Sequence, residues 1–122
     1  MNSPERTDRS EPDTRARAAV RPTRYEVSVL PEGDINRRHY TIYVEYRGNE
    51  QWAVHDGFAS LAVDGTWSEG LKSYGRYGWV ERHLFGLVTA LRLAEEAAPG
   101  VTVNGVTAAQ VLARSRAEGS DR

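Results

Sequence analysis

Hydrophobic and polar residues alternate along much of the chain between residues 24 and 67. A period of two is typical of half-buried β-strands, whose side chains point to opposite faces in turn. Asp56-Gly57 and Asp64-Gly65 are hairpin-turn sequences within this stretch. The pattern predicts an antiparallel β-meander of four to five strands, with strands over 24–30, 40–46, 52–54 and 59–63 and strand-like residues again at 66–67.

After residue 86 the spacing of apolar residues becomes helical. Gly86 fits a helix N-cap, and Pro99-Gly100 fits the end of that helix. After the adjacent pair Leu87-Val88, apolar positions recur at intervals of three and four, at Leu91, Ala94 and Ala98. We expect this amphipathic helix to pack on one face of the sheet, which gives a two-layer α+β fold.

The last segment predicts a short C-terminal helix. Residues 101–103 are extended in pattern, and Asn104-Gly105 is a turn sequence. Thr107 precedes Gln110 by three residues, which is the spacing of a capping box, and a helix over 108–116 should follow.

The same periodicities define the predicted core. Trp52 and Trp67 continue the strand alternation, so both are expected inside rather than on a binding surface. The core positions are Val27, Val29, Ile42, Val44, Trp52, Val54, Leu61, Val63, Leu87, Val88, Leu91 and Ala94.

A chain of 122 residues has room for one domain, which we place at 24–116. Residues 1–23 contain three prolines and no aromatic residue, so we expect a disordered arm, and we expect residues 117–122 to form a flexible tail. No apolar run approaches the length of a membrane span, and no secretory signal begins the sequence. We therefore expect a cytoplasmic protein with no membrane partner.

The charge distribution narrows the choice of partners. The formal net charge is −1, with six arginines and four acids among residues 1–24 and an acidic excess over the remainder. A near-neutral body does not favour polyanions, so nucleic-acid binding is an alternative rather than the first choice. Fifteen of the sixteen basic residues are Arg, which indicates a GC-rich genome and suggests an actinobacterial source.

Catalytic, metal and cofactor motifs are not found. His39, His55 and His83 lack the spacing of a metal site, and the absence of Cys excludes thiolate ligands. No serine lies in a nucleophile elbow, and the Gly75–Gly78 stretch matches no phosphate loop. We predict no catalytic residues, no metal and no cofactor; a small enzyme using His55 or His83 as general base is the remaining enzymatic alternative.

The regular pattern is interrupted at residues 70–79, before strand-like residues resume at 79–85. This loop combines aromatic and basic side chains with three glycines, a composition suited to binding. Alternatively, its aromatic side chains fold back and close the end of the sheet. The candidate binding residues are Lys72, Tyr74, Arg76, Tyr77 and Trp79, together with Tyr43 on the polar face of its strand.

The runs at 25–32, 40–46, 52–54, 64–67 and 89–98 resemble those of small uncharacterised proteins of actinobacteria and their mobile elements. That resemblance carries no catalytic motif and implies a bacterial, cytoplasmic setting but no activity. We therefore expect a non-catalytic protein-interaction or regulatory module, with a nucleic-acid accessory protein as the alternative. An uncovered sheet edge or face leaves self-association open.

Overall fold

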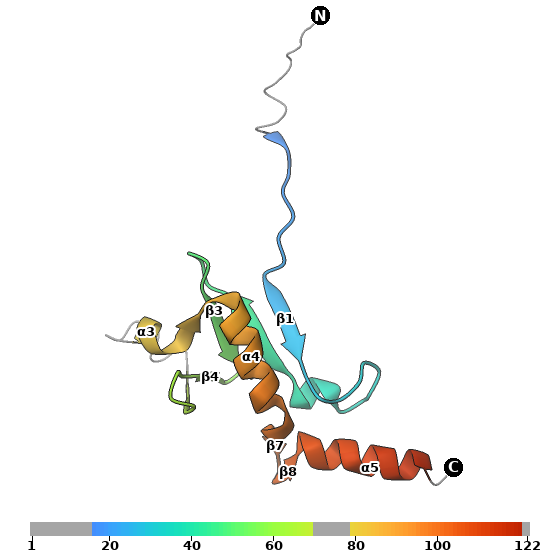
Figure 1. The fold of residues 1–122 in the computed structure, drawn as a ribbon. Coiled ribbons are helices and arrows are strands. Elements are labelled where there is room, and N and C mark those ends of the chain that lie inside the picture. Colours follow the sequence, from blue (N-terminus) through green and yellow to red (C-terminus); the bar gives the residue numbers. More distant parts are fainter. Residues whose placement is uncertain (1–15, 70–78, 121–122) are drawn as a thin grey trace, which may run out of the picture.

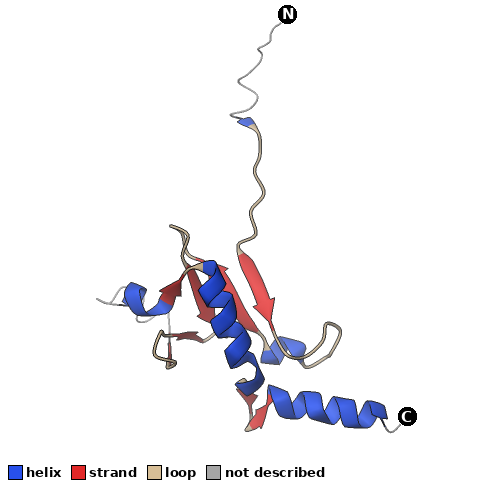
Figure 2. Ribbon diagram, in the orientation of Figure 1, coloured by secondary structure: helices blue, strands red, loops and turns tan. Residues whose placement is uncertain are grey.

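The computed structural model describes residues 16–69 and 79–120 (Figure 1). Its body has two layers, an antiparallel sheet and a helix, α4 (Leu87–Ala97), that crosses one face of that sheet (Figure 2). Residues 17–23 lead into the sheet without regular secondary structure. The predicted α+β class is confirmed. Among the helices of the described residues, none is long and apolar enough to cross a membrane.

The sheet follows chain order and is antiparallel throughout. Its strands are β1 (Arg24–Val27), β2 (Ile42–Tyr46), β3 (Trp52–His55), β4 (Ala59–Leu61) and β5 (Trp67–Glu69). A further strand, β6 (Leu84–Phe85), pairs with the first half of β3. Glycines at positive φ close the two predicted hairpins, Gly57 at 100° and Gly65 at 89°. The meander predicted from the alternation is therefore present.

The main core lies between the sheet and α4. Its buried members include Ile42, Val44, Trp52, Val54, Leu61 and Ala94, all predicted, together with Phe85, Ala90 and Ala98. Four other predicted positions, Val27, Val29, Leu87 and Leu91, are partly buried against this cluster. Small residues on α4 face the sheet because alanine lets the helix backbone approach closely.

Three core predictions are wrong. Val88 is 82% exposed, since the side of α4 that meets the sheet is centred on Ala90 and Ala94. Val63 is 64% exposed because it lies beyond the end of β4, where its N–H bonds the carbonyl of Arg82. Trp67 is 39% exposed because β5 is the last strand of the sheet path.

The segment 79–85 is not one extended run. It forms a short helix, α3 (Trp79–His83), followed by β6. Trp79 and His83 are four residues apart, so both lie on the same side of α3, and both are buried. The pattern looked strand-like because the helix is too short to show its period.

The C-terminal part has its own small core. After the 3-10 turn η2 (Ala98–Gly100), β7 (Thr102–Val103) and β8 (Val106–Thr107) form a hairpin, and α5 (Ala108–Ser120) follows. Leu30, Tyr40 and Ala108 are buried together, with Tyr40 supplied by the 3-10 turn η1 (Arg37–Tyr40). The predicted capping box is confirmed by reciprocal bonds between Thr107 and Gln110, of 2.8 and 3.1 Å. The helix extends beyond the predicted end at residue 116.

Candidate functional site

One row of side chains crosses the face of the sheet opposite α4. The strand register places Glu26 beside Tyr43, Tyr43 beside His55, His55 beside Ser60, and Ser60 beside Ser68. Directly paired residues point to the same face, so these five form a continuous band from β1 to β5. We call this band, Glu26, Tyr43, His55, Ser60 and Ser68, the polar row.

Tyr43 lies in the polar row, between a cation and an aromatic ring. The guanidinium carbon of Arg24 is 4.1 Å from the centroid of the Tyr43 ring. On the other side, the ring centroids of Tyr43 and His55 are 5.4 Å apart, with an interplanar angle of 31°. Tyr43 lies on the polar face, as the alternation predicts, but these neighbours leave it only half exposed.

His55 holds a fixed tautomer. Its Nδ1 accepts a hydrogen bond of 3.0 Å from the backbone N–H of Gly57, so its proton is on Nε2. Nε2 therefore donates to Oε1 of Glu45 at 2.7 Å. This hydrogen bond is the main reason why the pKa of Glu45 lies below its ordinary value, and Arg47, 3.5 Å from the second carboxylate oxygen, lowers that pKa further.

The turn after β3 displays an aromatic side chain. Oδ1 of Asp56 accepts from the N–H groups of Phe58 and Ala59 at 2.9 and 2.8 Å. The N–H of Asp56 donates to the carbonyl of Ala59 at 3.1 Å, and the Gly57–His55 bond joins the turn to the polar row. Phe58 is 88% exposed on this turn. Four hydrogen bonds thus fix the backbone around a large apolar side chain that has no core to enter.

The other end of the polar row is closed by α3. Nδ1 of His83 donates to the carbonyl of Trp79 at 2.9 Å, so Nε2 accepts from the hydroxyl of Ser68, also at 2.9 Å. His83 is 3% exposed, and its ring stacks on that of Trp79 at 4.3 Å with an angle of 11°. A buried histidine with both nitrogens bonded fastens α3 to β5.

The structure separates the predicted binding residues into three groups. Tyr43 is in the polar row, whereas Lys72, Tyr74, Arg76 and Tyr77 lie outside the described residues. Trp79 is 3% exposed and packs with Ala53 and Leu84. Its burial agrees with the alternative in which aromatic side chains of this loop fold back against the sheet. A binding role for residues 72–77 stays a prediction.

The predicted binding residues did not include Arg24, Glu45, His55 or Phe58, and His55 was considered only as a general base. Arg24 and Glu45 are opposite one another in the β1–β2 register, so correct strand pairing would have brought them together. Phe58 directly follows the Asp56-Gly57 turn and is not one of the alternating apolar positions of the next strand. This position could have indicated that Phe58 lies outside the core.

Within the described residues, no group of three or more His, Asp or Glu side chains converges to hold a metal ion. The surface presents aromatic rings, two arginines and carboxylates that hydrogen bonds and ion pairs hold in place. Comparisons with protein-family models, curated proteins and solved structures found no match to this chain.

Proposed function

We propose that this chain is a non-catalytic protein-interaction module that binds its partner through the sheet face opposite α4. The observation that carries the proposal is Phe58, a large apolar side chain that is 88% exposed on a turn fixed by four hydrogen bonds. Phe58 would enter an apolar pocket of the partner, and Tyr43 would add contact area from the polar row, which the Gly57–His55 bond joins to this turn.

A fixed backbone favours binding because little conformational entropy is lost when the partner arrives. Aromatic residues carry much of the binding energy at protein interfaces, where a few anchors dominate. Tyr43 is similarly restrained, since Arg24 and His55 flank its ring. These properties support a preformed recognition surface.

The charges on this face favour a protein partner over a nucleic acid. Arg24 and Arg47 are accompanied by the acids Glu26, Glu45 and Asp56. A polyanion would be repelled by those acids, whereas a protein surface can offer both signs. The Arg-rich arm at residues 6–24 would have to supply any nucleic-acid binding.

The general-base alternative has less support. Both ring nitrogens of His55 and both of His83 are already bonded within the protein. A general base needs a free nitrogen within reach of the proton it removes. His83, moreover, is almost fully buried.

Site-specific photo-crosslinking tests the proposal. A photoreactive phenylalanine derivative replaces Phe58 in one variant and Val88 in the other, because Val88 is similarly exposed but lies on α4, across the sheet. We expect a discrete adduct from position 58 and none from position 88. The purified crosslinked protein should then bind Phe58→Ala at least about tenfold more weakly than wild type, with Val88→Ala unchanged.

Equal adducts from both positions, or no adduct from position 58 in the native host, would contradict the proposal. Unchanged affinity of Phe58→Ala for the crosslinked protein would do the same. Since neither side chain is in the core, both variants should fold like the wild type.

A further inference from the structure

The outer edge of β1 presents unpaired backbone groups. Within residues 16–69 and 79–120, β1 pairs only with β2 and is the first strand of the sheet path, and Figure 1 shows it at the margin of the sheet. The N–H of Tyr46 bonds the carbonyl of Thr23 at 2.9 Å. Backbone groups in an antiparallel ladder alternate in direction, so those of Tyr25 and Val27 also point toward β2. Those of Arg24 and Glu26 therefore point outward, where another strand can pair.

The side chains on this edge have opposite charges. Arg24 and Glu26 are two residues apart, so both lie on the polar face of the sheet. Arg24 contacts the ring of Tyr43. Within residues 16–69 and 79–120, the Glu26 carboxylate forms no ion pair and accepts no hydrogen bond. The edge thus has a cation and an acid side by side, the acid with no charge partner in the described chain.

We propose that β1 pairs antiparallel with β1 of a second copy of this chain, in the register centred on Tyr25. In that register Arg24 is opposite the partner's Glu26, and Glu26 is opposite the partner's Arg24. Both pairs have their N–H and C=O groups pointing outward, so each forms two backbone hydrogen bonds. The two Tyr25 rings then meet at the centre, on the face that carries α4.

Charge selects this register over its neighbours. Centring the ladder on Arg24 places the two copies of Arg24 opposite each other, and centring it on Glu26 does the same for the acids. Like charges directly opposite one another destabilise a sheet. In a register centred between two residues, each residue whose N–H and C=O point outward would lie opposite one whose groups point inward, so the backbone hydrogen bonds could not form. Of these registers, the Tyr25-centred ladder is the one that satisfies the hydrogen bonds and sets each charge opposite an opposite charge.

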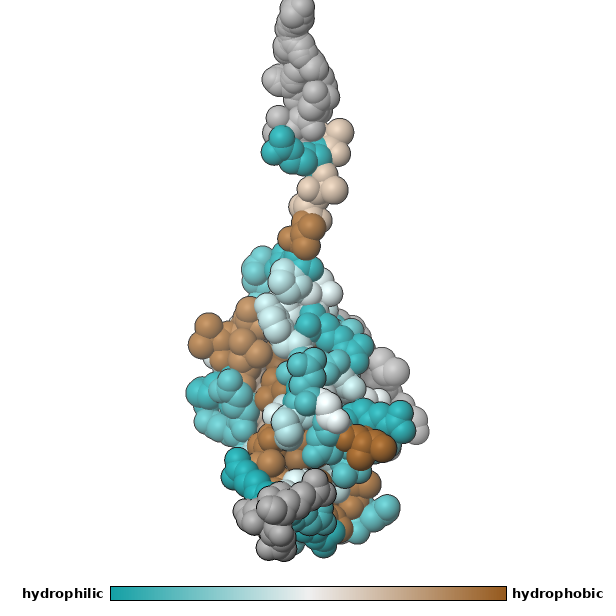
Figure 3. Space-filling model, turned by 90° about the vertical axis from the view of Figure 1, so that its right-hand side faces the viewer, coloured by the Kyte–Doolittle hydropathy of each residue, from teal (hydrophilic) through white to brown (hydrophobic). Residues whose placement is uncertain are grey.

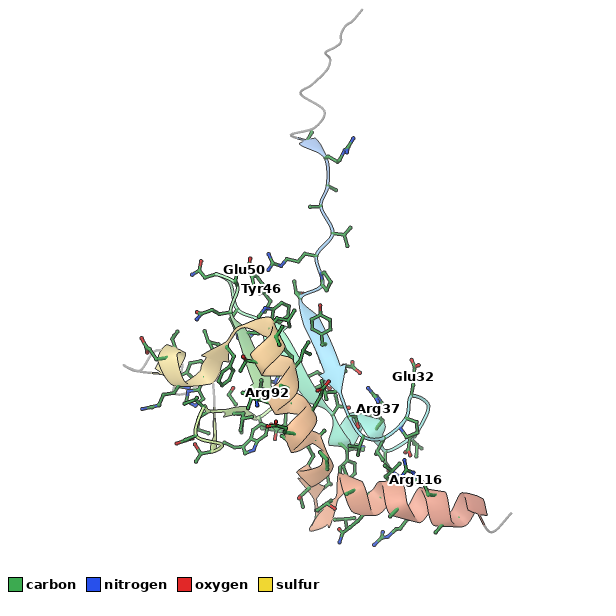
Figure 4. The ribbon with its side chains drawn as sticks, viewed as in Figure 1. Glu32, Arg37, Tyr46, Glu50, Arg92 and Arg116 are labelled. Carbon is green, nitrogen blue, oxygen red and sulfur yellow. The ribbon has the colours of Figure 1, made fainter. Side chains whose placement is uncertain are left out.

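The approach to β1 suits a short ladder. Pro22 has no N–H and ends the ladder on the N-terminal side. Arg21 is held away from the edge, because its guanidinium carbon lies 4.0 Å from the Tyr46 ring centroid and its Nη2 lies 3.3 Å from Glu50. Figure 4 shows Tyr46 and Glu50 together at one end of the sheet. The side of the molecule seen in Figure 3 mixes polar and apolar groups, which fits pairing by backbone and charge rather than by an apolar patch.

The paired edge would join two sheets into one. A two-fold axis perpendicular to the sheet relates antiparallel edge strands, so both copies of α4 lie on one face and both polar rows on the other. A ladder of about five residues is smaller than a standard interface, so we expect a dissociation constant in the micromolar range or weaker. The inference does not rest on the proposed function, because it uses the backbone edge of β1, whereas the proposed partner would contact Phe58 and Tyr43 on the sheet face opposite α4.

Charge exchange tests this register. In sedimentation velocity from about 10 µM to about 1 mM, wild type should pass from monomer to dimer. Glu26→Arg and Arg24→Glu should each weaken dimerisation at least about tenfold, because each sets like charges opposite one another. An equimolar mixture of the two variants should form a heterodimer, and the Arg24→Glu/Glu26→Arg double variant should dimerise like wild type.

Glu95→Arg makes the same charge change on the exposed side of α4 and should leave the dimer intact. Circular dichroism melts of each variant confirm that the monomer is folded. A wild type that stays monomeric at the highest concentration overturns the inference. So does a dimer that Glu26→Arg leaves unchanged, which would place the interface elsewhere.

Discussion

The two faces of the sheet are made by alternate residues of the same strands, yet they are held by different forces. On β2, Ile42 and Val44 are fully buried beneath α4. Between and after them, Tyr43 and Glu45 face the other way and are only partly covered. The first face depends on burial, which is non-directional. The second buries a small apolar cluster of Ala53, Trp79 and Leu84 beneath α3, and elsewhere it depends on directed contacts between neighbouring side chains.

That difference has a consequence for function. Hydrophobic burial fixes the positions of the strands, so the polar row receives its spacing from the opposite face. The contacts within the polar row then fix side-chain orientations, as the tautomer of His55 illustrates. Substitutions on such a surface should cost less stability than substitutions beneath α4, which suits the recognition surface that we propose.

The largest effect should come from removing an aromatic residue from the buried face. Trp52 is buried and packs against Tyr25 and Tyr46, with ring centroids 5.6 and 5.2 Å away. Trp52→Ala should lower the free energy of unfolding by about 3–5 kcal/mol, through lost burial and a residual cavity. Tyr43→Ala, on the opposite face, should cost only about 1 kcal/mol.

Urea denaturation followed by circular dichroism measures both values. Trp52→Phe keeps most of the apolar contact, so its free energy of unfolding should lie between those of wild type and Trp52→Ala. The phenylalanine variant still gives a measurement if the alanine variant does not fold. Equal losses for Trp52→Ala and Tyr43→Ala would mean that the two faces do not differ as we describe.

A smaller effect should follow from opening the end of the polar row. Ser68→Ala removes the hydroxyl that donates to Nε2 of His83, leaving a buried acceptor without a partner. The expected loss is about 1–3 kcal/mol in the free energy of unfolding. Ser68→Thr keeps the hydroxyl on a residue that favours strands and should retain most of the stability. If both variants lose the same amount, the hydrogen bond is not what fastens α3.

The sequence predicts those parts of the fold in which apolar or capping residues recur at a regular spacing. Alternation located the meander, and the Thr107–Gln110 spacing located the start of α5. The side of α4 that faces the sheet was predicted less well. The apolar side of α4 contains both alanines and larger residues. The helix backbone lies close to the sheet, so the small Ala90 is buried there while Val88 is exposed. Periodicity therefore predicts that α4 has an apolar side, but not which residues of that side lie closest to the sheet.

The candidate site was harder to predict, because it consists of pairs that meet across strands. His55 and Glu45 are ten residues apart, and only the β2–β3 register makes them neighbours. His83 joins Ser68 through a helix too short to recognise from its spacing. Tyr43 was found because it breaks the polar pattern within its own strand. Contacts between strands need the register, which alternation alone does not supply.

The smallest effect should be a change in ionisation within the polar row. The pKa of Glu45 is held below its ordinary value of 4.5, chiefly by the hydrogen bond from His55. Ionised Glu45 therefore stabilises the fold above pH 4.5, and this contribution is lost as the pH falls through the lowered pKa of the folded state. His55→Ala should raise the pKa of Glu45 toward 4.5 and reduce the dependence of stability on pH in that acidic range.

Carbon-13 NMR titration of the side-chain carboxyl groups measures this shift, and Asp64 provides an internal control. The pKa of Asp64 is also lowered, mainly by the hydroxyl of Thr66, which donates to its Oδ1 at 2.7 Å. His55→Ala should leave Asp64 unchanged, and Thr66→Ala should raise the pKa of Asp64 without moving that of Glu45. If Glu45 titrates identically in wild type and His55→Ala, the contacts of the polar row do not control its charge. The contrast between the two faces would then be one of exposure alone.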